Sequence, residues 1–296
     1  MMRKFLIIPA LILILIACNR TEHLGKKVVV VSILPQKYFV EQIGGNDFEV
    51  EVLVAPGASH ETYDPTPQQM VRLGDAKLWI KNGHLAFEEQ WEPKFRSTHP
   101  HLKVVDWSEG IDLIEGECEH THEAMAEEHH KGADPHYWLS PRQAGVLAQN
   151  TALALEKLYP ENKAVYEENL EKLLRRIRHL DTLAQTTLLP LSGKSFMIFH
   201  PALTYFAHDY GLKQIAVEQG GNAPTTRGLR EFVDLARKEN IQAIFIQQQF
   251  DRENAETIAR EIGAMVIPFD PMAEDWENNM FSIIIMLQES IQKKQP

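Results

Sequence analysis

From Glu161 to Leu189 the chain contains neither glycine nor proline, and its residues are compatible with one continuous helix. Because an α-helix rises 1.5 Å per residue, such a helix would be about 40 Å long. Pro160 precedes the stretch directly, and Pro141 follows Ser140, at positions where prolines commonly begin helices. We predict a helical linker over residues 141–189, with a rigid backbone helix over 161–189 that limits movement between the regions it joins.

Strands and helices alternate on both sides of this linker, in a similar order but without a residue-level repeat. The pattern predicts an α/β fold of two similar Rossmann-like lobes with mainly parallel sheets, over residues 27–140 and 190–296. The predicted strands are Val28–Ile33, Phe48–Val54, Leu78–Ile80, Lys103–Val105, Ser195–Phe199, Leu212–Val217, Ile241–Gln247 and Ala264–Phe269. The predicted helices are Tyr38–Ile43, one capped by Thr66 and begun by Pro67, one near 85–96, Ala202–Tyr210, Thr226–Asn240 and Glu253–Ile262.

The first eighteen residues indicate export. Arg3 and Lys4 precede a 13-residue apolar stretch (5–17), which is too short to span a membrane but typical of a signal peptide. Its end, Leu15–Cys18, resembles the lipobox of bacterial lipoproteins. We therefore expect a signal peptide over 1–17, a lipid on Cys18, a tether over 18–26, and anchoring to a bacterial membrane facing the periplasm or the cell exterior. An ordinary secretory signal is the alternative.

The composition of the chain bears on its partners and on how its fold is stabilised. The chain has 41 acidic and 30 basic residues, a formal net charge of −11, whereas a nucleic-acid partner would favour a basic surface. Hydrophobic residues make up 44%, enough for a buried core. With Cys18 lipidated, Cys118 has no partner in the chain, so we expect no intramolecular disulfide. We expect a monomer stabilised by its core or by a bound metal.

Histidines are frequent, 13 in all, and several fall in an acidic, low-complexity segment over 115–132. Imidazole and carboxylate groups together suit Zn²⁺ and other transition metals. We expect this segment to form a loop with a weak, secondary metal site, because ordering a loop costs conformational entropy. A solvated polar loop is the alternative. The histidines concerned are His120, His122, His129 and His130.

Further nitrogen and oxygen ligands stand next to predicted strands or helices. His136 precedes the helix at Pro141, His200 ends one strand, Asp270 ends another, and His60 and Glu61 follow a third. Because the carboxyl ends of strands line the ligand crevice of open α/β sheets, these groups could converge between the lobes as a four-ligand metal site. Taken singly, each could instead be a capping, core or turn residue.

Four motifs in the mature chain carry a resemblance to a known family. They are Pro56–Ser59 with Tyr63–Pro67, Asp134–Pro141, Phe199–Ala202 with Tyr205–Phe206 and Tyr210–Leu212, and Phe269–Pro271. They resemble the metal-binding solute-binding proteins of ABC transporters: zinc-uptake components with manganese-binding and adhesin-lipoprotein relatives. The resemblance implies two α/β lobes joined by a long helix, one metal ion between them, and a membrane permease and its ATPase as partners.

The resemblance also implies ligands. It carries over His136, His200 and Asp270 without adjustment, but the first ligand departs from the family pattern. Family members usually have histidine two residues before the residue matching Tyr63, where this chain has Glu61, with His60 one earlier. Register favours Glu61, with His60 as the alternative if the loop shifts by one. Neighbouring side chains of an extended loop point apart, so we do not expect both to bind one ion.

In the family, histidine at the position of His200 and a His-rich loop before the second ligand go with zinc. We therefore expect Zn²⁺, with Mn²⁺ or Fe²⁺ as the alternative, because Glu61 would weaken discrimination. A secreted zinc hydrolase is disfavoured, since the sequence has no HExxH motif or serine nucleophile elbow. A purely adhesive protein has no support beyond surface anchoring. The sequence thus predicts capture of zinc and its delivery to a permease.

Overall fold

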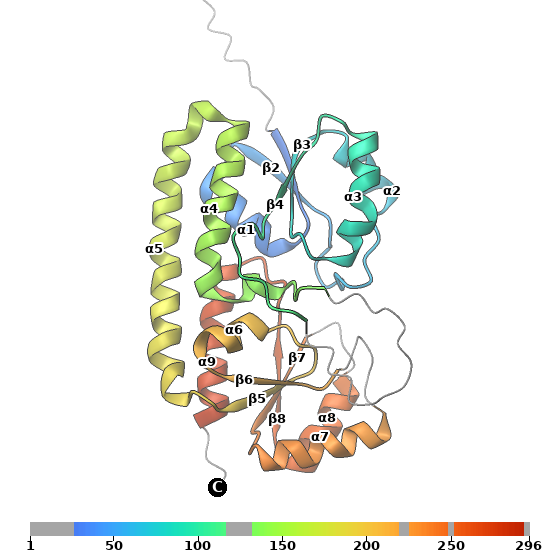
Figure 1. Ribbon diagram of the computed structural model, residues 1–296, viewed down its shortest axis with the longest axis vertical. Helices are drawn as coiled ribbons and strands as arrows, with labels where there is room; N and C mark the ends of the chain where they lie inside the picture. The colour runs from blue at the N-terminus through green and yellow to red at the C-terminus, as the bar shows by residue number, and fades with distance from the viewer. Residues whose placement is uncertain (1–26, 117–131, 219–224, 248–251, 293–296) are drawn as a thin grey trace, which may run out of the picture.

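The computed structural model describes residues 27–116, 132–218, 225–247 and 252–292. Within these ranges the chain forms two four-stranded parallel sheets flanked by helices, one sheet in each of two stacked lobes (Figure 1). A long helix, α5 (Lys163–Leu188), runs beside both lobes (Figure 1). The predicted α/β fold of two lobes with a long backbone helix is confirmed.

The N-terminal lobe has the strand order β2-β1-β3-β4. Its central strand β1 is a run of valines that is buried at its carboxyl end, whereas β2 alternates apolar and acidic residues as expected for a half-buried strand. Thr66 caps α2 and Pro67 begins it, as predicted. The elements are β1 (Lys27–Val31), α1 (Leu34–Gly44), β2 (Phe48–Val52), α2 (Pro67–Leu73), β3 (Ala76–Lys81), α3 (Ala86–Thr98) and β4 (Lys103–Asp106).

The C-terminal lobe has the order β6-β5-β7-β8, which is the same relative order as in the first lobe. The predicted helix Ala202–Tyr210 begins two residues later than expected: α6 begins at Thr204, and Ala202 and Leu203 form a turn before it. The elements are β5 (Ser195–Ile198), α6 (Thr204–Tyr210), β6 (Lys213–Ala216), α7 (Thr226–Lys238), β7 (Ala243–Gln247), α8 (Arg252–Ile262), β8 (Met265–Phe269) and α9 (Trp276–Gln292).

The linker is helical throughout most of its length. α4 (Pro141–Leu158) begins at the predicted proline, and α5 begins two residues later than predicted because Pro160–Asn162 form a 3-10 turn. A second 3-10 turn, His136–Leu139, precedes α4, and a third, Leu189–Leu191, follows α5. The buried residues of α5 recur at helical spacing and pack into the main core; they are Tyr166, Leu173, Ile177, Leu180, Ala184 and Leu188.

Helix α9 was not predicted, although its sequence carries the signal. Met280, Ile283, Ile284 and Leu287 are spaced along one helical face, and all are buried. The beginning of α9 contacts the other lobe: the Trp276 ring lies 5.2 Å from that of Phe39 in α1. Helix α9 therefore belongs to the core that joins the two lobes.

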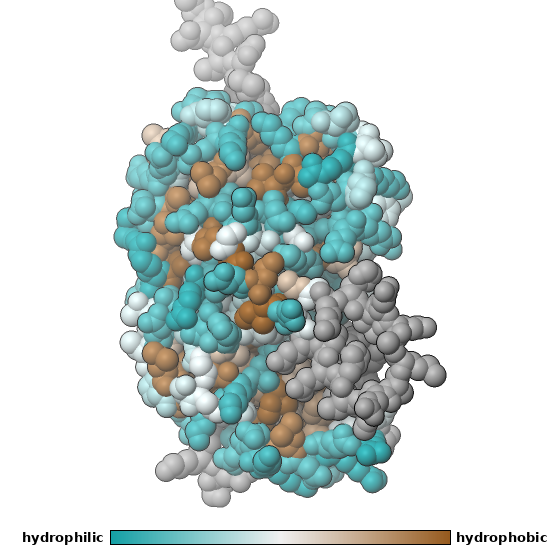
Figure 2. Space-filling view, in the orientation of Figure 1, coloured by the Kyte–Doolittle hydropathy of each residue, from teal (hydrophilic) through white to brown (hydrophobic). Residues whose placement is uncertain are grey.

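Several predicted features lie outside the described residues: the signal peptide, Cys18 and the tether, Cys118, and the four loop histidines His120, His122, His129 and His130. Both ends of the His-rich segment are described, and Glu115 pairs with Ala133 in an antiparallel bridge. Among the helices of the described ranges, none is long and apolar enough to cross a membrane. On the face shown in Figure 2, hydrophobic residues appear as separate patches within a mainly hydrophilic surface.

Candidate metal centre

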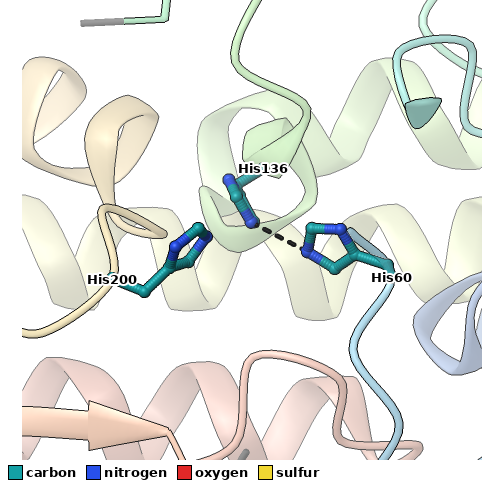
Figure 3. Close-up of side chains that lie close together, drawn as sticks. All are labelled: His60, His136 and His200. Atoms are coloured by element: carbon teal, nitrogen blue, oxygen red, sulfur yellow. Dashed lines mark hydrogen bonds between the residues drawn. The ribbon is translucent and has the colours of Figure 1, made fainter. Parts of the chain in front are cut away.

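Three histidines meet between the lobes (Figure 3). His60 comes from the loop after β2, His136 begins the 3-10 turn before α4, and His200 follows β5. Each is at least nine-tenths buried, and the three offer ring nitrogens that lie within 4.8 Å of one another. The structure thus brings together three of the residues that the sequence singled out.

The spacing of these nitrogens suits a small metal ion. His60 Nε2 lies 3.1 Å from His136 Nε2 (Figure 3). Two nitrogens bound to one tetrahedral zinc ion at about 2.0–2.1 Å would be roughly 3.3 Å apart. An ion could therefore replace the hydrogen bond between the two rings with little movement of either.

A buried carboxylate holds the outer side of His136. Asp134 Oδ1 accepts hydrogen bonds from His136 Nδ1 at 2.9 Å and from the His136 backbone N–H at 2.8 Å. Burial would raise the pKa of Asp134, but the contacts with His136 and Thr204 outweigh it and lower the pKa below its ordinary value. With Nδ1 directed at Asp134, Nε2 is the ring nitrogen of His136 that faces the cluster.

A second buried carboxylate holds His200. Glu218 Oε2 lies 2.8 Å from His200 Nδ1, and the Glu218 backbone N–H donates to the carbonyl of Phe199 at 2.8 Å. Burial opposes the charged form of His200, but the hydrogen bond to Glu218 and the charges of Glu61 and Glu218 outweigh it and raise its pKa. Neither carboxylate is among the ligands predicted from the sequence, although Glu218 follows a predicted strand and Asp134 lies in the motif Asp134–Pro141.

His60 differs from the other two histidines. Within the described part of the chain, no carboxylate is hydrogen-bonded to its ring. Burial, followed by the neighbouring imidazoles of His136 and His200, lowers the pKa of His60 well below its ordinary value. His60 is therefore neutral at physiological pH, which is the state that binds metals.

Glu61 also approaches the cluster. Its Oε1 lies 3.4 Å from His200 Nε2, and Glu61, His200 and Glu218 form a second group of potential ligands. In an extended loop, Glu61 and His60 would point apart, but residues 60–62 form a bend. Both side chains therefore come near His200.

Asp270 lies outside both groups of potential ligands. It is half-buried in the turn after β8, where its Oδ1 accepts a hydrogen bond from the backbone N–H of Met272 at 2.9 Å. Its backbone carbonyl accepts another from Asn279 at 2.8 Å. In this arrangement Asp270 shapes the turn into α9, and its role as a ligand stays a prediction.

A cavity of about 10 Å³ adjoins the histidines. It is lined by Ala58, Ser59, His60, Glu61, His200, Gln247, Pro271 and Met272. A water molecule needs about this much space, so the cavity beside the three imidazoles can hold one water.

Comparison with known proteins identifies the family. Residues 29–293 match the model of the family described as "ZnuA: Zinc-uptake complex component A periplasmic". The chain belongs to this family. The ZnuA match covers both lobes and the linker, so it includes every element that supplies a histidine to the cluster.

Individual relatives and solved structures support membership of this family. The high-affinity zinc uptake system protein ZnuA of Bacillus subtilis is 31% identical over 272 residues, covering 87% of this chain and 84% of that protein. A crystal structure of ZnuA has a TM-score of 0.82 at 35% identity, covering 90% of this chain and all of that one. Zn(II)-bound AdcA from Streptococcus pneumoniae has a TM-score of 0.76 at 25% identity, covering 92% of this chain. This chain spans 59% of the AdcA chain.

Proposed function

We propose that this protein captures zinc between its lobes and delivers it to an ABC-type permease for import. The observation that carries the proposal is the group of three buried imidazoles whose ring nitrogens lie within 4.8 Å of one another. Membership of the zinc-uptake family and the zinc named in the relatives' descriptions support the same cargo.

The proposed ligands are His60, His136 and His200, with Glu61 as the oxygen ligand in the fourth position. This choice revises the ligands that the family resemblance implies, which included Asp270 and, by register, Glu61 in preference to His60. It is supported by the 3.1 Å between His60 and His136 and by the 3.4 Å between Glu61 and His200. Three nitrogens and one oxygen favour a borderline ion such as Zn²⁺ over the harder Mn²⁺.

A binding role accounts for this geometry better than catalysis does. A catalytic zinc site keeps one position open for water or substrate, whereas four side chains would close a tetrahedral zinc site. We therefore propose a transport protein that is not an enzyme, anchored through Cys18 on the outer side of a bacterial membrane and served by a permease and its ATPase.

The test is a titration of the chain from residue 19 with zinc and manganese against a competing chelator. We expect one tight zinc equivalent and weaker manganese binding. His60→Ala should abolish the tight site, and Glu61→Ala should weaken it. Asp270→Ala serves as the matched control and should bind zinc as the unaltered chain does.

Each alternative has its own result. Tight manganese with weak zinc binding would replace the proposed cargo. Loss of zinc binding in Asp270→Ala, with His60→Ala unaffected, would restore the ligands that the family resemblance implies. Absence of tight binding of either ion would refute capture itself.

A further inference from the structure

Gln247 lines the same cavity as His60, Glu61 and His200, but the sequence analysis did not single it out. It is the last residue of β7, and its side chain is almost completely buried, with 1% of the residue exposed. A polar side chain so deeply buried at the carboxyl end of a strand needs partners for both ends of its amide.

One end of the amide has its partner. Gln247 Nε2 donates to the backbone carbonyl of His200 at 3.1 Å. Because a carbonyl can only accept, this contact fixes which end of the amide is nitrogen and which is oxygen. Gln247 Oε1 is buried and has no donor among the residues that the structure describes.

Two of the residues that line this small cavity therefore carry acceptor oxygens, Glu61 and Gln247. A carboxylate such as Glu61 accepts hydrogen bonds and does not donate them, and Gln247 Oε1 likewise only accepts. A single water molecule, with two hydrogens, can serve both, and the cavity has about the volume that one water requires. The Glu61 side chain is 35% exposed, so a hydrogen bond from the cavity would restrict its movement. The contact of the Glu61 backbone N–H with Ser59 Oγ, at 3.2 Å, holds only the backbone.

We propose that Gln247 is a positioning residue: its Oε1 holds a water molecule that donates to the Glu61 carboxylate and keeps Glu61 in place as the oxygen ligand of the captured zinc ion. The inference rests on the proposed function, since it assigns a role to Gln247 within the same site. It makes Gln247 act on the metal through Glu61, without contacting the ion.

The test is a double-mutant cycle on zinc affinity with Gln247→Met and Glu61→Ala, singly and together. Methionine keeps the length and burial of the side chain but removes the acceptor. We expect Gln247→Met to weaken zinc binding about 3- to 10-fold, the effect of one hydrogen bond. In the Glu61→Ala background the same change should alter affinity less than about twofold.

Equal losses in both backgrounds would overturn the proposal, because they would show that Gln247 acts through the His200 carbonyl. An unchanged affinity in Gln247→Met would overturn it as well. If the unaltered chain binds no zinc, it is the proposed function that fails. A crystal structure of the zinc-loaded chain gives a test without substitution: a water within hydrogen-bond distance of Gln247 Oε1 and Glu61 is expected, and direct coordination of zinc by Oε1 would refute the inference.

Discussion

The two lobes share one strand order but use the carboxyl ends of their sheets differently. In the N-terminal lobe, Glu88 from α3 fills the crevice at the carboxyl ends of the strands. Its carboxyl group accepts hydrogen bonds from Ser32 Oγ and from the backbone N–H groups of Asn82 and Gly83. In the C-terminal lobe, the polar side chains at the ends of neighbouring strands belong to the histidine cluster or lie beside it. They are His200, Glu218 and Gln247.

This difference separates what topology provides from what side chains provide. Parallel sheets of the same order create a crevice at the same place in both lobes. In the first lobe the chain supplies its own carboxyl group, which accepts hydrogen bonds from the backbone donors there. In the second the histidine and its carboxylate partner leave a ring nitrogen for the cluster. The N-terminal lobe reaches the candidate metal centre from a loop and a 3-10 turn instead, through His60, Glu61 and His136.

The largest expected effect on zinc affinity comes from removing a proposed ligand in the crevice of the C-terminal lobe. His200→Ala removes a proposed ligand and should weaken zinc binding beyond the roughly 10–100-fold loss that follows removal of a partner behind a ligand. Competition with a chelator measures this. His208→Ala is the matched control, because His208 lies on α6 with an exposed side chain and should leave zinc affinity unchanged. A zinc affinity of His200→Ala equal to that of the control would remove His200 from the ligands.

The next effect concerns the carboxylate behind the ligand. Glu218→Gln removes the charge that orients and supports His200, and should weaken zinc binding by about 10-fold or more. Glu239→Gln is the control in the same lobe, since Glu239 accepts from Ser195 Oγ at the opposite end of the sheet. Zinc affinities that agree between the two variants would mean that Glu218 fills space without supporting the ligand.

A smaller effect is expected in the pH dependence of binding. Zinc requires neutral imidazole, and the raised pKa of His200 means that protons begin to compete above its ordinary value of 6.5. Zinc affinity should therefore fall as pH decreases from 7.5 to 5.5. Glu218→Gln removes the hydrogen bond and one of the charges that raise the pKa of His200, so this pKa should be lower in the variant and the fall should begin at lower pH. His60, with its lowered pKa, adds little in this range. The same pH midpoint in both proteins would contradict this account.

The sequence predicted the place of the site but not its full arrangement. The position of His200 at a strand end is a local property of the chain, and so is the position of His136 beside a helix start. Whether His60 or Glu61 reaches the cluster depends on the bend at 60–62, which the surrounding lobes determine. The partnership of Glu218 with His200 joins two neighbouring strands, and no spacing along the chain encodes their distance.

The fold was more predictable than the site, for a physical reason. Periodic burial repeats along an element, so strands and the helix α5 could be located to within about two residues. Helix α9 carries the same periodic signal and could have been found. The role of Glu88 could not be predicted, because it accepts hydrogen bonds from backbone N–H groups, which every residue except proline possesses.

The smallest effect on zinc is expected from Glu88→Gln, which should change the affinity less than about twofold because Glu88 belongs to neither group of potential ligands. Its effect should appear in stability. Burial raises the pKa of Glu88 from 4.5 to about 7, so between these values the folded protein keeps a proton that the unfolded chain releases. The stability that this group contributes is fully present below pH 4.5 and is lost as pH rises through 7.

Glu88→Gln should remove this loss, so thermal unfolding of the metal-free chain from pH 5 to 8 should depend less steeply on pH in the variant. An identical pH dependence in the two proteins would show that the carboxylate is ionised throughout. A large loss of zinc affinity would show that the filled crevice of the first lobe is coupled to the metal centre. The contact of Asn82 Nδ2 with the carbonyl of Pro135, next to His136, is the path by which such coupling would act.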